Sequence, residues 1–232
     1  MSMLTEEISL RDKLHVFEDR EEAGRLLAEK LSRYKESDSM VLAIPSGGVP
    51  VASAIAGSLN LPIDLIIVRK IQIPFNTEAG FGAMDPDGNV IFNEGLLNHL
   101  KLTENQIRTQ IKQTTDVITK RNRLFREGKP YPALQNRDVI VADDGLASGY
   151  TMLAAVRFIK RKNPHKIIAA VPTGSKRTIE FILPELDELV CLNVRSRFPF
   201  AVADAYVKWH DLTDKEVLNI LKKFHNISSL PD

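Results

Sequence analysis

Residues 139–151 read VIVADDGLASGYT, and this stretch decides how the rest of the sequence is interpreted. Four apolar residues lead directly into Asp143 and Asp144, and a run of mostly small residues follows and ends at Thr151. A continuous apolar run predicts a strand buried on both faces, as in a parallel sheet. Two adjacent carboxylates repel each other, so their position at the end of a buried strand indicates a ligand that relieves the repulsion.

The acidic pair and the loop after it offer two different kinds of contact to a ligand. Carboxylates accept hydrogen bonds from the vicinal hydroxyls of a sugar, and both can also bind Mg²⁺. Gly145 and Gly149 permit a tight turn, and the unpaired first N–H groups of the helix that follows favour an anion. Ser148 and Thr151 add hydroxyl donors. The stretch therefore predicts a site for a sugar that carries a phosphate group, such as ribose 5-phosphate.

The composition indicates a globular chain without a strong bias of charge. The 232 residues are 44% hydrophobic and 26% charged, and the formal net charge is +1. No long-range field is therefore available to attract nucleic acid or a membrane surface. Cys191 is the only cysteine, which excludes an internal disulfide and disfavours a Cys-based zinc site. The N-terminal segment lacks the apolar core of a signal peptide, and no apolar run reaches the roughly 18 residues of a membrane span, so we expect a cytoplasmic protein.

The order of the expected elements predicts an α/β fold. Apolar runs at 40–44 and 63–68 flank a Gly-rich turn and a helix, which is a βαβ unit with a parallel sheet. Strands and helices alternate again after residue 138. Between the two parts we expect an insertion at about 71–130, made of a loop at 71–80, a hairpin and a long helix that Thr103 caps. The whole chain, 1–232, is predicted to be a single domain with a small C-terminal hood at about 194–232.

The quoted stretch resembles the thirteen-residue signature of the type I phosphoribosyltransferases. That signature has four mostly apolar residues, two acids, a run of small residues, and then Gly, any residue and Thr, and VIVA-DD-GLAS-G-Y-T covers all of it. The sequence is most similar to a branch of predicted phosphoribosyltransferases with a hairpin and a long inserted helix, and this resemblance covers roughly residues 16 to 222. It implies a type I phosphoribosyltransferase-like fold, with a central parallel sheet flanked by helices.

The resemblance also implies a reaction and a set of site residues. The substrate would be phosphoribosyl pyrophosphate with Mg²⁺, whose ribose 5-phosphate group passes to a nitrogenous base while pyrophosphate leaves. Substrate-binding roles are implied for Ser46, Gly47, Gly48, Arg69, Lys70, Asp143, Asp144, Gly145, Leu146, Ala147, Ser148, Gly149, Tyr150 and Thr151. Of these, Asp143, Asp144 and Lys70 are expected to act in catalysis, and Asp143 and Asp144 to hold Mg²⁺ directly or indirectly. The 71–80 loop is expected to close over the site.

Two departures from the family pattern keep a second function open. The branch usually has arginine at position 46, where this chain has Ser46, and Tyr150 stands where a small residue is common. A serine keeps one hydrogen bond but loses a bidentate charged contact. The alternative is therefore a regulatory protein that binds phosphoribosyl pyrophosphate or a nucleotide without turnover. A hydrolase or kinase of sugar phosphates is disfavoured, because TGSKRT at 173–178 lacks the first Gly and the spacing of a nucleotide P-loop.

The acceptor base and the oligomeric state are left open by the sequence. Six aromatic residues could stack on a base or belong to the core: Phe75, Phe81, Phe198, Phe200, Tyr206 and Trp209. Glu78 and Asp204 could contact the edge of a base. The apolar stripe of the 103–127 helix belongs either to the core or to a dimer surface, so a homodimer is among the arrangements left open.

Overall fold

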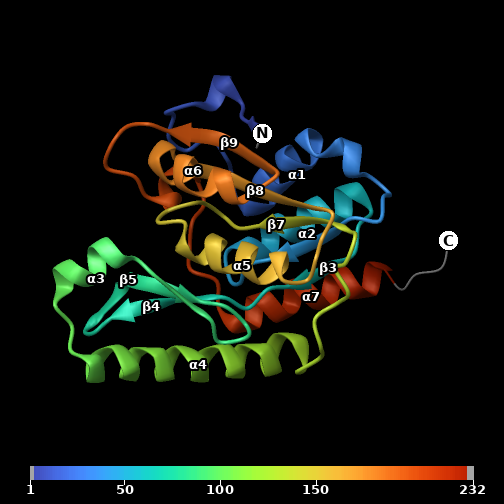
Figure 1. Ribbon diagram of the computed structural model, residues 1–232. Helices are drawn as coiled ribbons and strands as arrows, with labels where there is room; N and C mark the ends of the chain where they lie inside the picture. The colour runs from blue at the N-terminus through green and yellow to red at the C-terminus, as the bar shows by residue number, and fades with distance from the viewer. Residues whose placement is uncertain (1–2, 229–232) are drawn as a thin grey trace.

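The centre of the molecule is a six-stranded parallel sheet with the strand order β1-β9-β8-β7-β2-β3 (Figure 1). This computed structural model describes residues 3–228, apart from the side chains of 77–78 and 225–228. The strands are β1 (Met3–Thr5), β2 (Met40–Ala43), β3 (Ile63–Leu65), β7 (Asp138–Ala142), β8 (Lys166–Ser175) and β9 (Glu188–Arg195). Every residue of β2 and β9 is buried, as expected for strands covered on both faces.

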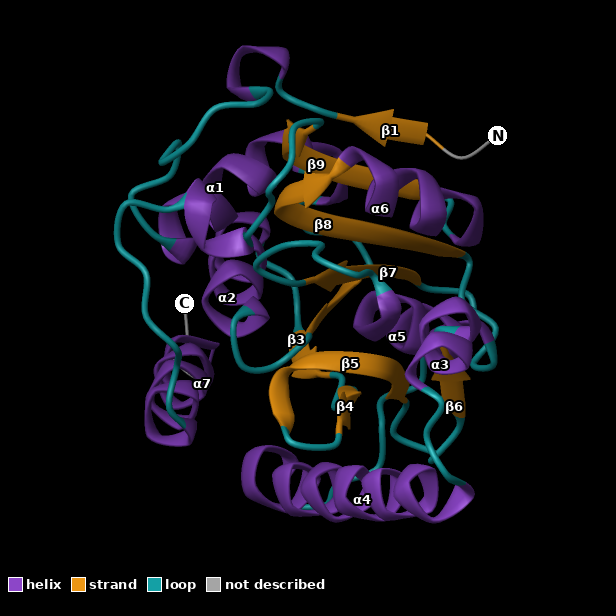
Figure 2. Cartoon of the chain, turned by 90° about the vertical axis from the view of Figure 1, so that its left-hand side faces the viewer, coloured by secondary structure: helices purple, strands orange, loops and turns teal. Residues whose placement is uncertain are grey.

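Helices cover both faces of this sheet (Figure 2). One face carries α1 (Arg20–Lys30) and α2 (Gly48–Leu59), and the other carries α5 (Tyr150–Lys160) and α6 (Lys176–Ile182). The sheet therefore separates two apolar cores, one of which also contains Val217 and Leu221 of α7 (Asp214–Ser228). Four short 3₁₀ helices complete this part: η1 (Ile8–Leu10), η2 (Ser32–Tyr34), η3 (Leu183–Glu185) and η4 (Val202–Ala205).

A second, smaller sheet lies between β3 and β7 in the chain. It contains β4 (Arg69–Ile73), β5 (Asn76–Met84) and β6 (Val90–Phe92), all antiparallel, and two helices follow, α3 (Glu94–Leu100) and α4 (Glu104–Arg126). In both views α4 runs along the outer side of this sheet (Figures 1 and 2). The capping box predicted at Thr103 is confirmed, because its side chain and that of Gln106 each bond the other's backbone N–H.

Two expectations about this region are wrong. The strand expected at 63–68 ends at Leu65, and the loop expected at 71–80 is instead most of β4 and β5. The pairing of β4 with β5 contains two irregularities, and at Gly82 an added Cβ would lie only 2.5 Å from the Ile91 carbonyl oxygen. A strand with glycines and bulges lacks the alternating pattern that predicts a strand, so its pairing depends on close approach of neighbouring backbone.

A buried ion pair fixes the C-terminal end of α4 to the main sheet. Arg126 donates from Nε to Asp64 Oδ1 at 2.9 Å and from Nη2 to Asp64 Oδ2 at 2.7 Å. Its guanidinium also lies 3.7 Å from the centre of the Tyr131 ring and donates to the Lys129 carbonyl oxygen. Because a bidentate pair has a fixed geometry, the last turn of α4 has a defined position next to β3.

All six strands are parallel, but the order in which the chain adds strands changes direction between β7 and β2. From β7 the order continues through β8 and β9, whereas from β2 it continues to β3 on the other side. The helices after these two strands, α5 and α2, consequently lie on opposite faces. Loops that follow the strands separate at such a switch point and leave a crevice at the carboxyl edge. Among the helices of the described residues, none combines the length and apolarity that a membrane span requires.

Two glycines on neighbouring helices test the close packing of α1 on α2. At Gly24 an added Cβ would lie 2.6 Å from the Val51 carbonyl oxygen and 2.7 Å from the Ala54 Cβ, whereas at Gly57 nothing lies within 4 Å. We expect Gly24→Ala to lower the free energy of unfolding by about 1–3 kcal/mol through overpacking. Gly57→Ala should raise it by up to about 1 kcal/mol through helix propensity. Urea denaturation measures both, and changes of the same sign would contradict this packing.

Candidate functional site

The loops after β2 and β7 lie side by side at the switch point. The Ile44 N–H donates to the Ala142 carbonyl oxygen at 2.9 Å, which joins the two strand ends. The peptide bond between Pro45 and Ser46 is cis. At Gly47 an added Cβ would lie 1.8 Å from Asp144 Oδ2, so the first loop passes directly against the second aspartate. The sequence predicted both loops, and the structure brings them together.

The Asp144 carboxylate forms an ion pair with an arginine that the sequence did not single out. Arg20 Nε donates to Asp144 Oδ2 at 2.9 Å, and the two side chains are only 7% and 15% exposed. Burial raises the pKa of Asp144, and the charge and hydrogen bond of Arg20 oppose that rise. Pairing is what makes a second carboxylate tolerable at this position. The arginine therefore neutralises one of the two acids before any ligand binds.

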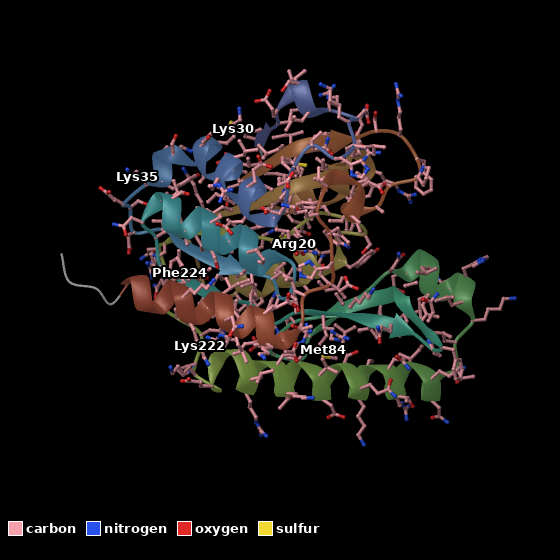
Figure 3. The ribbon with its side chains drawn as sticks, turned by 180° about the vertical axis from the view of Figure 1, so that it is seen from behind. Arg20, Lys30, Lys35, Met84, Lys222 and Phe224 are labelled. Carbon is pink, nitrogen blue, oxygen red and sulfur yellow. The ribbon has the colours of Figure 1, made fainter. Side chains whose placement is uncertain are left out.

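Arg20 is held in turn by the segment between β9 and α7. Its guanidinium lies 3.8 Å from the centre of the Trp209 ring and donates to the His210 carbonyl oxygen at 3.0 Å. The Tyr206 hydroxyl donates to the Asp144 carbonyl oxygen at 2.7 Å, and burial raises the pKa of this tyrosine. Figure 3 labels Arg20 near the middle of the molecule, at the N-terminal end of α1. Cation–π contact and hydrogen bonds thus orient the arginine from two sides.

Asp143 is the acid without an ion-pair partner among the described residues. Its Oδ1 accepts a hydrogen bond from the Asp144 N–H at 2.9 Å. Burial raises the pKa of Asp143 well above its ordinary value, and the neighbouring Asp144 charge raises it further. Of the two carboxylates, Asp143 is therefore the one that gains most from a hydroxyl donor or a cation in the crevice.

The loop from Gly145 to Gly149 is held by the end of β8. The Leu146 N–H donates to the Thr173 carbonyl oxygen, and the Thr178 hydroxyl donates to the Ala147 carbonyl oxygen at 2.5 Å. Gly149 has φ +80°, a left-handed conformation that favours glycine. The segment 173–178, which is not a P-loop, therefore supports the loop from behind. No pattern in the sequence indicated that role.

The loop and the first turn of α5 contain consecutive N–H groups without an acceptor among the described residues. Within the described residues, the N–H groups of 147–152 donate no hydrogen bond to the protein. The last three belong to the first turn of α5, at the positive end of its helix dipole. Ala147 and Ser148 are exposed. The Tyr150 ring packs against Phe181 of α6, with 5.3 Å between ring centres. This geometry suits a phosphate group.

The basic residues near the first loop have a different arrangement from the one expected. Arg69 and Lys70 are consecutive residues of β4 in regular register with Met84 and Ala83, so their side chains point to opposite faces of that strand. Arg121 of α4, which the sequence did not single out, reaches Ser46 Oγ with its Nη2 at 3.4 Å. The positive charge that contacts the first loop therefore comes from α4 of the insertion.

The aromatic candidates divide into core and surface residues. Phe81 and Tyr206 are buried in the core, whereas Phe75 and Phe198 are among the most exposed side chains. A cavity of about 490 Å³ opens beside the loop from Gly145 to Gly149. Its lining includes Ser148, Tyr150, Arg177, Phe181, Phe198 and Phe200. The side chain of Glu78 lies outside the described residues. Asp204 accepts from the Ala201 N–H at 3.3 Å, within its own short helix.

Among the described residues, no group of three or more His, Cys, Asp or Glu side chains lies close enough together to hold a metal ion. The residues present still fit a magnesium ion that arrives with a phosphorylated substrate. Mg²⁺ in such sites uses one or two carboxylates, phosphate oxygens and water. Asp143 has an available carboxylate of this kind, whereas Asp144 is already paired with Arg20.

Comparisons with known proteins point to one family. Residues 15–204 match the family model described as "Phosphoribosyl transferase domain". Two Mycobacterium tuberculosis relatives, "Putative phosphoribosyl transferase" MT0597 and Rv0571c, are each 33% identical over 212 residues, which is 91% of this chain and 48% of the relative. The chain thus spans about half the length of these curated relatives. The crystal structure of TT1426 from Thermus thermophilus is 33% identical, with a TM-score of 0.72 and coverage of 90% of this chain and 98% of that chain.

The contact between the two loops can be tested at Gly47. A methyl group there would occupy the position of the Asp144 carboxylate, so we expect Gly47→Ala to displace the carboxylate from Arg20. Affinity for ribose 5-phosphate should fall at least about tenfold, as the loss of charge-assisted hydrogen bonds implies. Isothermal titration calorimetry measures this, with Gly57→Ala as the control. Unchanged affinity in Gly47→Ala would show that Asp144 does not contact the sugar.

The raised pKa of Asp143 predicts a pH-dependent cost of the acidic pair. At a pH above the folded-state pKa, ionised Asp143 lowers the free energy of unfolding by its full amount. This destabilisation decreases as the pH falls and disappears near the pKa of an unfolded aspartate, about 3.9. We expect Asp143→Asn to be more stable than the wild type at pH 7, with a difference that shrinks toward pH 4. The amide oxygen can still accept from the Asp144 N–H. Urea midpoints at several pH values measure this, and a difference independent of pH would refute it.

Proposed function

The chain belongs to the phosphoribosyl transferase domain family, and we propose that it transfers the ribose 5-phosphate group of phosphoribosyl pyrophosphate to a nitrogenous base. One observation carries the proposal. At the switch point of the sheet, an acidic pair that can accept from two ribose hydroxyls lies directly before a loop and helix terminus with free N–H groups for a phosphate. The acidic pair suits the ribose hydroxyls, and the N–H groups suit the phosphate of ribose 5-phosphate.

The proposed roles follow the positions of the groups. Asp143 accepts hydrogen bonds from the ribose hydroxyls, and Asp144, oriented by Arg20, lies beside it. The N–H groups of residues 147–152 hold the 5-phosphate. The Ser46–Gly48 turn, at the N-terminal end of α2, faces pyrophosphate, and Arg69 and Lys70 lie on β4, which packs against α4. No side chain is needed as a nucleophile, since the protein acts by positioning and by electrostatic stabilisation.

The reaction breaks one bond and forms another at the anomeric carbon. The bond from that carbon to pyrophosphate breaks, and its electron pair leaves with the pyrophosphate oxygen. Positive charge develops on the sugar, and the acidic pair beneath it stabilises that charge. The lone pair of the base nitrogen then forms the new bond, and the proton on the nitrogen passes to water. Mg²⁺, when bound, neutralises charge on the phosphate oxygens, and Asp143 is the residue that would hold it.

The cavity beside the phosphate loop is our candidate for the acceptor site. Ser148 of the loop and Phe200 of the segment after β9 both line it, so it adjoins the position of the ribose 5-phosphate. Tyr150 and Phe198 offer aromatic surface, and Arg177 offers a hydrogen-bond donor. A planar ring with a polar edge suits such a lining. This supports a nitrogenous base as the acceptor.

The alternative function uses the same site without turnover. Ser46 places a hydroxyl where the family resemblance implies an arginine, and this loss of a bidentate contact would slow the departure of pyrophosphate. Under this alternative the protein binds phosphoribosyl pyrophosphate and responds to its concentration. Binding is common to both functions, and only release of pyrophosphate distinguishes them.

We expect the protein to release pyrophosphate when it is incubated with Mg²⁺, phosphoribosyl pyrophosphate and a panel of purine and pyrimidine bases. At a ligand concentration of ~100 times Kd, phosphoribosyl pyrophosphate should stabilise the fold by about 2.7 kcal/mol. Coupled detection of pyrophosphate and thermal melting measure the two effects. A melting shift without turnover would favour the regulatory alternative, and the absence of any shift would refute both.

A second ligand pair tests the assignment of the acidic residues. Ribose 5-phosphate offers both hydroxyls to the acidic pair, whereas 2-deoxyribose 5-phosphate lacks one. We expect the deoxy compound to bind about tenfold or more weakly, because one buried acceptor then loses its donor. In Asp144→Asn the affinity for ribose 5-phosphate should fall while the far-UV circular dichroism stays unchanged. Equal affinities for the two sugars would show that the hydroxyls are held elsewhere.

A further inference from the structure

Arg121 lies at the contact between the inserted helix and the first loop. Its Nη2 is 3.4 Å from Ser46 Oγ and 3.4 Å from Asp214 Oδ1 at the start of α7. The side chain is 22% exposed, so it is neither fully buried nor fully solvated. Both of these contacts are long for hydrogen bonds of a charged group. The guanidinium therefore has capacity for a stronger acceptor.

Arg69 of β4 places a second guanidinium in the same neighbourhood. Burial lowers the pKa of Arg69, the positive charge of Arg121 lowers it further, and the Asp214 charge opposes this. Asp214 is paired with Arg121 alone among the described ion pairs, and its carboxylate is 43% exposed. Like charges at close range disfavour each other. An anion between the two arginines and the loop would relieve that repulsion.

The position selects which anion this is. Ser46 belongs to the turn that leads into α2, and the next two residues are glycines beside the ends of β2 and β7. The N–H groups proposed to bind the 5-phosphate, at residues 147–152, belong to a different loop from the one that contains Ser46. We propose that Arg121 binds the diphosphate group of phosphoribosyl pyrophosphate, and that it brings a guanidinium from α4 to the Ser46–Gly48 turn. This inference rests on the proposed function.

The structure gives α4 the rigidity that such a role requires. Arg126, five residues beyond Arg121, is fixed to Asp64 by its bidentate ion pair. Ile118 and Phe125 of the same helix are buried in the main core. A guanidinium on a fixed helix loses less freedom on binding than one on a loop. The helix α4 therefore contributes to the site and also covers the small sheet.

The experiment compares three variants with three ligands by isothermal titration calorimetry. The variants are Arg121→Gln, Arg121→Lys and the control Arg123→Gln, whose arginine lies two residues away on the exposed side of α4. The ligands are phosphoribosyl pyrophosphate, inorganic pyrophosphate and ribose 5-phosphate, all with Mg²⁺. Ribose 5-phosphate lacks the diphosphate, so it reports on the rest of the site. Thermal melting of each variant confirms that it is folded.

We expect Arg121→Gln to weaken both diphosphate ligands by about ten- to a hundredfold and to leave ribose 5-phosphate within about twofold. Arg121→Lys keeps the charge without the planar fork, so its loss should be intermediate. It also serves as the test if the Gln variant does not fold. Arg123→Gln should bind all three ligands as the wild type does.

Two other results have distinct meanings. If the wild type binds phosphoribosyl pyrophosphate and both Arg121 variants bind it equally well, the inference about Arg121 is wrong and the proposed function stands. An equal loss for all three ligands would also overturn the inference, because it would indicate a general structural role. If the wild type binds none of the three ligands, the proposed function itself fails.

Discussion

The ion pair between Arg20 and Asp144 is the interaction on which the site depends. Two adjacent aspartates at the end of a buried strand would repel each other and lose hydration, and Arg20 removes the worst of this conflict by pairing with one of them. The pair also explains the residues around it. Gly47 has no side chain because the Asp144 carboxylate fills that space, and Trp209 covers the guanidinium. Removal of one partner of such a buried pair typically costs about 3–5 kcal/mol.

The charges around the crevice are arranged by sign. The two carboxyl groups lie at the end of β7, whereas the guanidinium of Arg121 lies beside the first loop. Among the described residues Asp143 has no ion-pair partner, and the contacts of Arg121 with Ser46 and Asp214 are both 3.4 Å long, so a ligand of opposite charge would lower the electrostatic free energy of each group. Sites organised in this way are ready for the charge of a reaction before it develops. The balanced net charge of +1 conceals this local separation.

Much of the fold was predictable because it depends on local patterns. The continuous apolar runs of β2 and β7, the Gly-rich turns and the capping box at Thr103 each report on a few neighbouring residues. The β4–β5 pair was not predictable in this way. Its sequence lacks the alternation of a half-buried strand, and its position depends on packing against α4 and on backbone approach at Gly80, where an added Cβ would lie 2.9 Å from the Ile71 carbonyl oxygen. The three-residue β1 at the edge of the sheet has no recognisable pattern either.

The sequence by itself determined the acidic pair, the loop after it and the glycines of the first loop, because strand, turn and helix terminus follow one another within about a dozen residues. The tertiary structure alone decided which cations meet these groups. Arg20 lies 124 residues before Asp144, and Arg121 lies 75 residues after Ser46. In the sequence each is one charged residue among many in a helix. Their roles arise only when the sheet order places β2 beside β7 and Arg126 fixes the insertion next to β3, since long-range packing has no local periodicity that a sequence pattern can report.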